Sequence, residues 1–534
     1  MLKNPLYTYG KRGGLKIPAH FHYGEHLLRK FGGYGDKEAV VNAETGESLT
    51  FRQLVQQSVD IALSLVRIGV RKGEVVAVCS EKRFEFIPTV LGIICAGATY
   101  TGVDVTGGRA TILHRAKLAK PSVIFCSPSA YEVHRETIKS IDSLRKVIMF
   151  EGGEREWEDV LGFSQFLSES APLEEFQPID VEGWSDVAII LYSSGTTGLP
   201  KGIPHTHLNL LLILGETGDK SPYANTRTLI TREWYYSYGL MHTLLTLSLG
   251  STVLYCPSGD TRNFLEAIQN YKIDVIQVAP STVSELVDSS LLPQYDASSL
   301  ACLISCSTPL SAELGQAAKA RFPNLGIIHQ YYAMSEAGAI CGDQRAPKGQ
   351  KPGSVGCVAD AFTLKVVDVT TRRPLGTNQR GEICFKSPSL MPGYIGEKSS
   401  DYLDEEGFFK TGDIGYYDED RYFYIVGRIK ELIKFNSYQV APAELDAVLA
   451  QHPAVLKAGV AGAPHQEYGE VPTAFVVLRP GCEATAQELV DYVDGQVSYR
   501  MRLAGGVRFV DDLPTVANGK LDRKKLKAIL TEDS

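Results

Sequence analysis

Apolar and polar residues follow two different periods along the first 180 residues of this 534-residue chain. Apolar positions recur at helical spacing over Phe51–Val66, and Thr50 and Gln53 just before them predict a capping box. Short apolar runs of strand length follow, among them Val75–Cys79 and Val123–Cys126. Strands separated by helix-length patterns predict a parallel or mixed sheet with helices on its faces.

The same alternation continues after an acidic segment, Glu151–Trp184, which predicts a surface connection. Val187–Tyr192 then predicts a buried strand, and His207–Leu214 predicts an almost wholly apolar helix. Further predicted helices lie at Phe84–Ala96, Arg109–Lys120, Phe264–Tyr271 and Ser311–Phe322. Further predicted strands lie at Ser251–Tyr255, Val275–Val278 and Leu325–His329.

The pattern changes twice in the C-terminal part. From about Gly353 to Val426, short strands and turns predict an antiparallel barrel or a distorted sheet. Beyond this region, about a hundred residues alternate as a small α+β unit that ends in a basic helix. We therefore expect an α/β protein with a large N-terminal domain, residues 1–426, and a small C-terminal domain, residues 427–534, joined at Gly427.

Composition excludes several classes of protein. A net charge of −8 argues against a nucleic-acid binder, and no apolar run is long enough for a transmembrane segment. The ten cysteines contain no C-x-x-C pair, which predicts reduced, buried thiols. We expect a cytoplasmic protein, because the last residues are not the Ser-Lys-Leu signal, although peroxisomal import by another route stays open.

The segment Ser193–Gly202 is the first candidate for chemistry. It holds four hydroxyls, three glycines and Lys201 within ten residues, directly after a predicted buried strand. Glycines let backbone N–H groups turn toward a ligand, hydroxyls donate hydrogen bonds, and lysine adds a positive charge, so the mixture suits phosphate oxygens. The spacing is not that of a Walker A loop. An ordinary polar surface loop is the alternative.

Four motifs in a fixed order give the chain a family resemblance: Ser193–Gly202, Tyr332–Glu336, Thr411–Asp413 and Asn518–Lys520. With them, the chain resembles the ANL superfamily of adenylate-forming enzymes over essentially its whole length. This superfamily comprises acyl- and aryl-CoA synthetases, peptide-synthetase adenylation domains and beetle luciferases. Within the superfamily, the residue pattern most resembles that of the 4-coumarate–CoA ligase and luciferase branch, notably at Tyr438–Leu445.

The resemblance implies a site for ATP and Mg²⁺. The implied nucleotide-binding residues are Ser193, Ser194, Gly195, Thr196, Thr197, Gly198, Lys201, Ser307, Thr308, Tyr332, Ser335, Glu336, Asp413, Arg428 and Lys520. In the family, the glycine-rich loop grips the β- and γ-phosphates, and Glu336 matches the residue that helps to hold Mg²⁺. Without the family, Glu336 is a solvated carboxylate and Thr411–Asp413 an ordinary turn.

The same resemblance assigns roles around the adenosine and the α-phosphate. Tyr332 matches the aromatic residue packed on adenine, Asp413 the ribose-binding carboxylate, and Arg428 an arginine that contacts the nucleotide. Lys520 matches a lysine from the small domain that bridges the substrate carboxylate and the α-phosphate. Taken alone, Lys520 follows the turn signal Asn518–Gly519 in a basic tail, where most lysines are merely solvated.

A second half-reaction is also implied, in which the small domain rotates and CoA attacks the adenylate. Lys434 and Tyr438–Ala441 then line the approach of the thiol, so the implied catalytic groups are Lys520, Lys434, Thr196 and Lys201. The hinge position, usually Asp or Lys, is Gly427, which permits rotation but carries no charge. Ser437 stands where relatives usually have glycine, and we expect the larger side chain to narrow the thiol path.

The implied acid pocket departs from the family pattern. Its residues are Tyr236, Tyr238, Ser307, Tyr331, Ala333 and Met334. Tyr236 stands where many relatives carry histidine, and Ala333 and Ser307 replace glycines, which predicts a narrower or reshaped pocket. With the apolar helix Leu208–Leu214, these side chains favour an uncharged aliphatic or aromatic acid, although apolar helices are more often core.

The predicted reaction is therefore the ATP-dependent ligation of a carboxylic acid to CoA. The acid and ATP give an acyl-adenylate and pyrophosphate, and CoA then gives a thioester and AMP. Two alternatives stay open: a luciferase-like oxygenase that uses the adenylate, and a nucleotide-binding relative without turnover. The expected ligands are ATP, Mg²⁺, CoA and a small carboxylic acid; the sequence does not define the acid or the oligomeric state.

Overall fold

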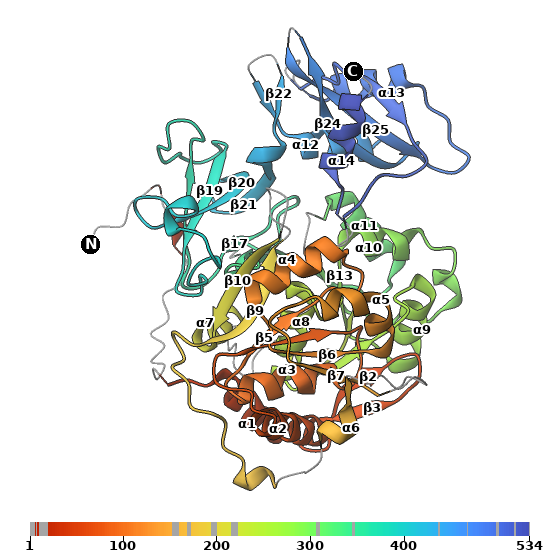
Figure 1. The fold of residues 1–534 in the computed structure, drawn as a ribbon. Helices are drawn as coiled ribbons and strands as arrows, with labels where there is room; N and C mark the ends of the chain where they lie inside the picture. The colour runs from red at the N-terminus through yellow and green to blue at the C-terminus, as the bar shows by residue number, and fades with distance from the viewer. Residues whose placement is uncertain are drawn as a thin grey trace.

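The computed structural model describes residues 6, 8–9, 20–151, 160–167, 172–193, 200–214, 223–305, 310–343, 346, 348–435, 438–466, 468–497, 501–516 and 520–532. Its strands form four sheets, and helices cover the two largest of them (Figure 1). The predicted α/β class is confirmed. None of the described helices combines the length and the apolar character needed to span a bilayer.

A seven-stranded sheet occupies the N-terminal part of the chain, in the order β10-β9-β5-β4-β6-β7-β8. Its strands are β4 (Val75–Cys79), β5 (Thr99–Gly102), β6 (Val123–Cys126), β7 (Lys146–Met149), β8 (Val160–Gly162), β9 (Val187–Ser193) and β10 (Lys201–Thr206). All neighbours are parallel except β9 and β10, which form an antiparallel pair. The predicted parallel or mixed sheet is thus confirmed.

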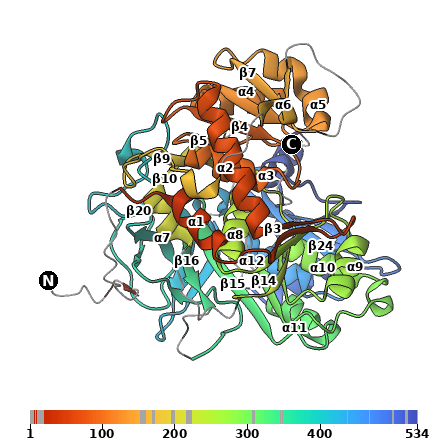
Figure 2. The same cartoon turned by 90° about the horizontal axis from the view of Figure 1, so that it is seen from below.

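Helices of this first region pack in layers on the sheet, as the view from below shows (Figure 2). They are α1 (Tyr23–Gly32), α2 (Phe51–Arg67), α3 (Phe86–Cys95), α4 (Arg109–Ala119), α5 (Pro128–Lys139), α6 (Phe163–Phe166) and α7 (His207–Leu214). The capping box of Thr50 and Gln53 at the start of α2 is confirmed.

The segment Glu151–Trp184 is more than the surface connection that its acidity suggested. It contributes the edge strand β8 and the short helix α6. Phe163 and Phe166 on α6 are buried, and their rings contact that of Phe125 on β6 at centroid distances of 6.3 and 5.4 Å. The burial of these aromatic rings fixes the segment against the sheet.

A nine-stranded sheet forms the second layer, in the order β17-β16-β15-β14-β13-β11-β12-β2-β3. Its strands are β2 (Glu38–Asn42), β3 (Ser48–Thr50), β11 (Arg227–Ile230), β12 (Thr252–Tyr255), β13 (Val275–Val278), β14 (Cys302–Ser305), β15 (Ile327–Met334), β16 (Gly338–Gly342) and β17 (Cys357–Val358). The associated helices are α8 (Ser237–Ser248), α9 (Thr261–Tyr271), α10 (Pro280–Asp288) and α11 (Ala312–Arg321). The strands from β2 to β15 pair in parallel, so their carboxyl ends lie at one edge.

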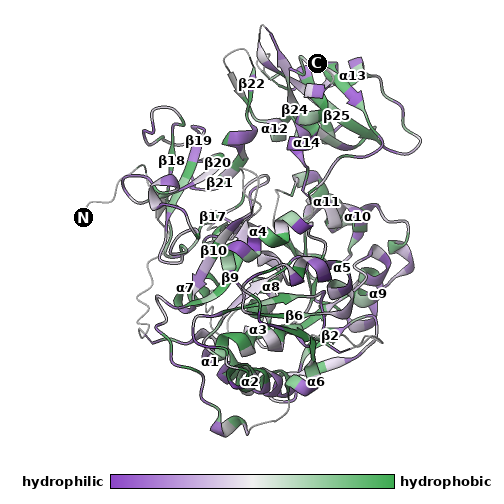
Figure 3. Cartoon of the chain, viewed as in Figure 1, coloured by the Kyte–Doolittle hydropathy of each residue, from purple (hydrophilic) through white to green (hydrophobic). Residues whose placement is uncertain are grey.

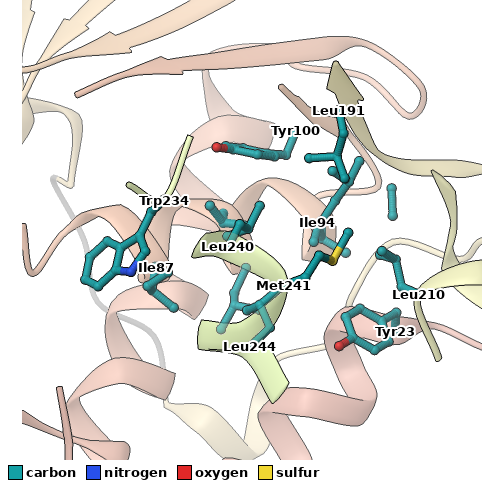
Figure 4. Packing of buried hydrophobic residues seen from close by; sticks show 14 of the residues in the cluster. Tyr23, Ile87, Ile94, Tyr100, Leu191, Leu210, Trp234, Leu240, Met241 and Leu244 are labelled. Atoms are coloured by element: carbon teal, nitrogen blue, oxygen red, sulfur yellow. The ribbon is translucent and has the colours of Figure 1, made fainter. Parts of the chain in front are cut away.

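The two large sheets share the main hydrophobic core, which appears as green ribbon inside the lower body (Figure 3). Helix α8 is central to it: Leu240 and Leu244 are fully buried beside Trp234, Ile87 and Tyr100 (Figure 4). The described cysteines are free thiols. Most are buried as predicted, whereas Cys482 is exposed.

The predicted antiparallel region is a five-stranded sheet in the order β1-β18-β19-β20-β21. Its strands are β1 (Thr8–Tyr9), β18 (Thr363–Val367), β19 (Gly381–Lys386), β20 (Phe409–Tyr417) and β21 (Phe423–Arg428). Within it, Asp413 on β20 stands directly opposite Arg428 on β21. This register places two predicted site residues side by side.

The C-terminal elements form their own sheet, drawn in blue in Figure 1. They are β22 (Ile433–Phe435), β23 (Tyr438–Val440), α12 (Pro442–Ala450), β24 (Val455–His465), β25 (Gly469–Leu478), α13 (Ala486–Asp494), β26 (Val507–Phe509) and α14 (Arg523–Glu532). An ion pair of 2.7 Å joins Arg380, before β19, to Glu444 on α12. The position of the domain boundary at Gly427 stays a prediction.

Candidate active site

One large cavity lies where the central sheets, the antiparallel sheet and the C-terminal segment meet. Its volume is about 1690 Å³. Sites for single small molecules usually measure about 300–1,000 Å³, so this cavity has room for more than one ligand. Residues from distant parts of the chain line it, including Lys201, Glu336, Asp413, Arg428 and Lys520.

Two buried carboxylates lie on the wall of this cavity, each held by a tyrosine. The Tyr332 hydroxyl donates to Asp413 Oδ2 at 2.6 Å, and the Tyr394 hydroxyl donates to Glu336 Oε1 at 2.5 Å. Glu336 is only 4% exposed and Asp413 only 5%. Burial raises the pKa of both carboxyls above the usual range, because loss of water disfavours the charged form. A bound cation near these groups is therefore favourable.

Asp413 also has a cationic partner. Arg428 Nε lies 3.1 Å from Asp413 Oδ1, across the β20–β21 pair. Both carboxylate oxygens thus have a protein partner, one through Arg428 and the other through Tyr332. These partners fix the orientation of the carboxylate toward the cavity.

Lys201 lies on a strand rather than in a loop. It is the first residue of β10 and pairs with Ser193, the last residue of β9, so the phosphate-loop candidate connects two antiparallel strands in the sequence. Lys201 Nζ lies 2.8 Å from Glu397 Oε2 and 4.6 Å from the centre of the Tyr394 ring. The loop residues predicted to bind phosphate, Ser194, Gly195, Thr196, Thr197 and Gly198, lie outside the described residues.

The two lysines predicted for the two half-reactions lie in different places. Lys520 lines the cavity, and its charge is among those that oppose the rise in the pKa of Asp413. Lys434 is exposed on β22 and is absent from the cavity wall; its backbone N–H donates to Glu470 at 2.8 Å. The structure therefore places Lys520, and not Lys434, on the wall of the cavity that Asp413 and Glu336 also line.

Arg523 anchors the segment that carries Lys520, a role that no prediction included. Its guanidinium pairs with Asp446 on α12 and lies 3.1 Å from Glu431. It also donates to the carbonyl oxygen of Val460 at 2.8 Å. These contacts fix the chain three residues after Lys520.

The predicted acid-pocket residues that the structure describes all lie on the cavity wall. They are Tyr236, Tyr238, Tyr331, Ala333 and Met334. Ser307, which was assigned both to this pocket and to the nucleotide, lies outside the described residues together with Thr308. The end of α7, residues 212–214, also lines the cavity.

Tyr236 is held by an acidic partner. Its hydroxyl donates to Asp104 Oδ2 at 2.7 Å. Burial and this carboxylate raise the pKa of Tyr236 above its usual value, so the phenol stays neutral. Arg232, His242 and Gln277 also line the cavity, although no motif in the sequence marks them.

His205 on β10 holds the backbone of the motif Tyr332–Glu336 through a hydrogen bond. Its Nε2 lies 2.8 Å from the carbonyl oxygen of Ser335. A carbonyl oxygen only accepts hydrogen bonds, so Nε2 is the ring nitrogen that carries the proton. Burial lowers the pKa of His205 to about 4, so the imidazole is neutral. Strand β10 thereby holds the residue that precedes Glu336.

Asp343, just after β16, supports the strand that carries the same motif. Its Oδ2 accepts a hydrogen bond from the backbone N–H of Gln330 at 3.2 Å, and burial raises the pKa of its carboxyl to about 6.

The raised pKa of Asp343 makes the stability of the fold depend on pH. The contribution of this carboxyl to the free energy of unfolding is fully present below its unfolded-state pKa of about 4, and it is lost as pH rises through the folded-state pKa of about 6. Asp343→Asn should therefore raise the melting temperature by roughly 2 °C above pH 7 and change it little near pH 4. Thermal unfolding between these pH values checks this; a difference that is constant with pH would contradict it.

The chain is similar to known proteins over most of its length. The family profile described as AMP-binding enzyme matches residues 27–395, and that of the AMP-binding enzyme C-terminal domain matches residues 444–520. The luciferin 4-monooxygenase of Nipponoluciola cruciata is 36% identical over 509 residues, which are 92% of this chain and 91% of that protein. The 4-coumarate–CoA ligase 1 of Petroselinum crispum is 32% identical over 98% of this chain and 97% of that protein.

A solved structure extends the similarity to three dimensions. The crystal structure of ATP-bound MatB from Rhodopseudomonas palustris matches with a TM-score of 0.83 and 26% identity, over 95% of this chain and 99% of that chain. With the family profile covering more than half of the residues, the predicted resemblance is confirmed. The chain belongs to the AMP-binding family of adenylate-forming enzymes.

Proposed function

We propose that the protein joins a carboxylic acid to CoA in two steps. The acid first reacts with ATP to give an acyl-adenylate and pyrophosphate, and CoA then displaces AMP to give a thioester. The observation that carries the first step is the position of Lys520, which lies on the wall of the same cavity as Glu336 and the pair of Asp413 and Arg428. The curated relatives named 4-coumarate–CoA ligase support the second step.

Asp413 is the proposed ribose ligand. Arg428 and Tyr332 each use one lone pair of its two oxygens, and a carboxylate has about four acceptor sites. The remaining sites suit two adjacent ribose hydroxyls, which donate hydrogen bonds. The buried ring of Tyr332 then lies beside the adenine. The sequence motif and the contacts of this carboxylate thus support the same assignment.

Glu336 is the proposed protein ligand of Mg²⁺. Its carboxylate is buried and, within the part of the chain that the structure describes, receives one side-chain hydrogen bond, from Tyr394. No group of three His, Cys, Asp or Glu residues suited to a metal occurs in the described ranges. This fits Mg²⁺, which proteins bind through one or two carboxylates together with substrate phosphates. When bound, Mg²⁺ neutralises charge on the departing pyrophosphate.

Lys201 is the proposed partner of the terminal phosphates. Its ammonium now pairs with Glu397, and both side chains are partly exposed. A triphosphate carries more negative charge than one carboxylate, so it competes with Glu397 for this ammonium. The cation then opposes the charge that develops on pyrophosphate.

Lys520 is the proposed catalytic group of the first step. The substrate carboxylate attacks the α-phosphorus, the bond to pyrophosphate breaks, and no protein nucleophile takes part. Both reactants are anions, so an ammonium between the carboxylate and an α-phosphate oxygen lowers their repulsion and positions them for attack. Arg523 holds the chain that delivers this lysine.

The second step needs another arrangement, because Lys434 lies outside the cavity. We propose that residues 427–534 rotate about Gly427, after which Lys434 lines the approach of CoA. Among the described residues, an added Cβ at Gly427 would meet only Ala441 Cβ, at 3.6 Å, which is ordinary van der Waals contact. The glycine is therefore not required by packing, and its use fits a position whose backbone torsions change.

A product assay separates this proposal from the oxygenase alternative, which the luciferin 4-monooxygenase relatives support. The purified protein is incubated with ATP, Mg²⁺ and a panel of acids, with and without CoA. We expect AMP release to rise with CoA and a thioester to form without oxygen uptake. Oxygen uptake or light without CoA would instead assign the oxygenase reaction.

A further inference from the structure

The segment 391–397, between β19 and β20, lies against two parts of the proposed ATP site. The backbone N–H of Met391 donates to the carbonyl oxygen of Glu336 at 2.8 Å, and that of Ile395 donates to the carbonyl oxygen of Gly202 at 3.0 Å. An added Cβ at Gly202 would lie 2.9 Å from Ile395 Cδ1, so the start of β10 and this segment are in close contact. The segment therefore connects the start of β10 to the proposed metal ligand.

Tyr394 in this segment contacts both charged groups. Its hydroxyl donates to Glu336 Oε1 at 2.5 Å, and the centre of its ring lies 4.6 Å from Lys201 Nζ, within the range of a cation–π contact. Burial and the negative charge of Glu336 raise the pKa of the Tyr394 phenol above its usual range, so the hydroxyl stays neutral. The ring packs edge-on against that of Tyr402 at a centroid distance of 5.1 Å. These contacts fix the aromatic surface beside the Lys201 ammonium.

Glu397 supplies a negative charge at the same position. Its Oε2 lies 2.8 Å from Lys201 Nζ, and the side chains of the glutamate and the lysine are 29% and 27% exposed. Neither residue forms a second ion pair in the described part of the chain. A partly exposed ion pair contributes little to stability, so the ammonium can leave this carboxylate at a small cost. The pair is therefore suited to the exchange of one anion for another.

We infer that Glu397 is an internal competitor that weakens the binding of ATP and of pyrophosphate by occupying Lys201. This inference rests on the ATP site of the proposed function. A phosphate that takes the ammonium leaves an unpaired carboxylate beside it, and a phosphate that shares the ammonium lies close to a like charge. In both cases the carboxylate lowers the affinity. AMP has no phosphate at this position, so its affinity does not depend on Glu397.

The same competition favours the release of pyrophosphate. Formation of the adenylate leaves pyrophosphate at Lys201, where the carboxylate of Glu397 is already in reach of the ammonium. When the lysine returns to this carboxylate, pyrophosphate loses a cation that holds it, and the reverse reaction loses its substrate. Glu397 is thus a positioning residue, because it acts through Lys201 and bonds to no reacting atom.

The test is the affinity of the protein for ATP, pyrophosphate and AMP, each measured by calorimetry with Mg²⁺ present. In Glu397→Gln, which keeps the shape of the side chain without its charge, we expect ATP and pyrophosphate to bind about three- to fivefold more tightly. Inhibition of adenylate formation by pyrophosphate should strengthen by the same factor. The affinity for AMP should stay within about twofold of the wild-type value. Glu397→Ala should show the same selectivity, so the result does not depend on the amide.

Asp296→Asn is the matched control. It removes one negative charge from an exposed ion pair of the same length, Lys272–Asp296 at 2.8 Å, which lies off the cavity wall. We expect it to change none of the three affinities. In a Lys201→Ala background, Glu397→Gln should not change the binding of ATP or pyrophosphate, because the carboxylate acts only through this lysine.

Two results for Glu397→Gln would overturn the inference. One is an affinity for pyrophosphate that is unchanged or lower, and the other is tighter binding of AMP by the same factor as ATP. If the wild-type protein binds neither ATP nor pyrophosphate, the inference and the proposed function both fail. Binding of both ligands without exchange of pyrophosphate for any acid would reject the proposed reaction alone, because the affinities test Glu397 without turnover.

Discussion

Replacing Lys520 by alanine is expected to slow acyl-adenylate formation by about 10²–10³-fold while leaving ATP binding nearly unchanged. Lys520 lines the cavity near Asp413, and no other part of the proposed mechanism brings a cation between the acid and the α-phosphate. The adenine, ribose and terminal phosphates are assigned to other residues, so affinity for ATP should persist. The measurement is single-turnover formation of the adenylate, with ATP affinity measured by calorimetry.

Lys434→Ala is the control for this substitution. Lys434 is also a lysine of the C-terminal part, but it is exposed and lies off the cavity wall. We expect this variant to form the adenylate at the wild-type rate and to be slowed only in thioester formation. Equal rates of adenylation for Lys520→Ala and the wild type would contradict the assignment of Lys520.

Replacing Glu336 by glutamine is expected to lower the maximal rate of adenylation by about 10²-fold and to raise the Mg²⁺ concentration needed for half-maximal activity. The amide has nearly the same shape but lacks the charge that attracts the metal. Burial already disfavours the charged form of Glu336, so its loss should not destabilise the fold. The measurement is a Mg²⁺ titration of pyrophosphate exchange, with the melting temperature as the folding control.

Tyr394→Phe is the matched variant for Glu336. It removes the hydroxyl that donates to Glu336 at 2.5 Å but keeps the carboxylate. We expect a smaller shift in the Mg²⁺ titration than for Glu336→Gln. If Glu336→Gln leaves the titration and the maximal rate unchanged, the carboxylate does not hold the metal.

Much of the fold could be predicted from local patterns, because many elements have sharp boundaries in the sequence. Strands β4, β6 and β13 have the predicted bounds, since turn or polar residues flank each apolar run. Helix α8 was not predicted, because both of its faces carry apolar residues. One face packs in the core and the other lines the cavity, so no polar stripe marks it as a surface helix.

The site was predicted as a set of motifs, but its contacts were not. Lys201 and Glu397 are 196 residues apart, and Tyr394 and Glu336 are 58 apart. Such pairs depend on how sheets pack, and no local pattern encodes that packing. Gln277 illustrates the same limit, because a single polar residue in a buried strand has no spacing that marks it.

Several predictions stay untested by the structure. The phosphate loop 194–199, the segment 306–309 and Ser437 lie outside the described residues. The hinge at Gly427, the role of Lys434 in the thiol step and the cytoplasmic location also stay predictions. The hinge and the thiol step each concern a motion of one domain against the other, and the location is a cellular address, so neither follows from local sequence patterns.

Acid-dependent exchange of labelled pyrophosphate into ATP tests the central claim most directly. It reports the reversal of adenylate formation and needs neither CoA nor oxygen. We expect the wild-type protein to catalyse exchange only when a suitable acid and Mg²⁺ are present, and Lys520→Ala to lose at least 10²-fold of this rate. No exchange by the folded wild-type protein across short, medium-chain, long-chain, hydroxylated and aryl acids would contradict the claim and favour a nucleotide-binding protein without turnover.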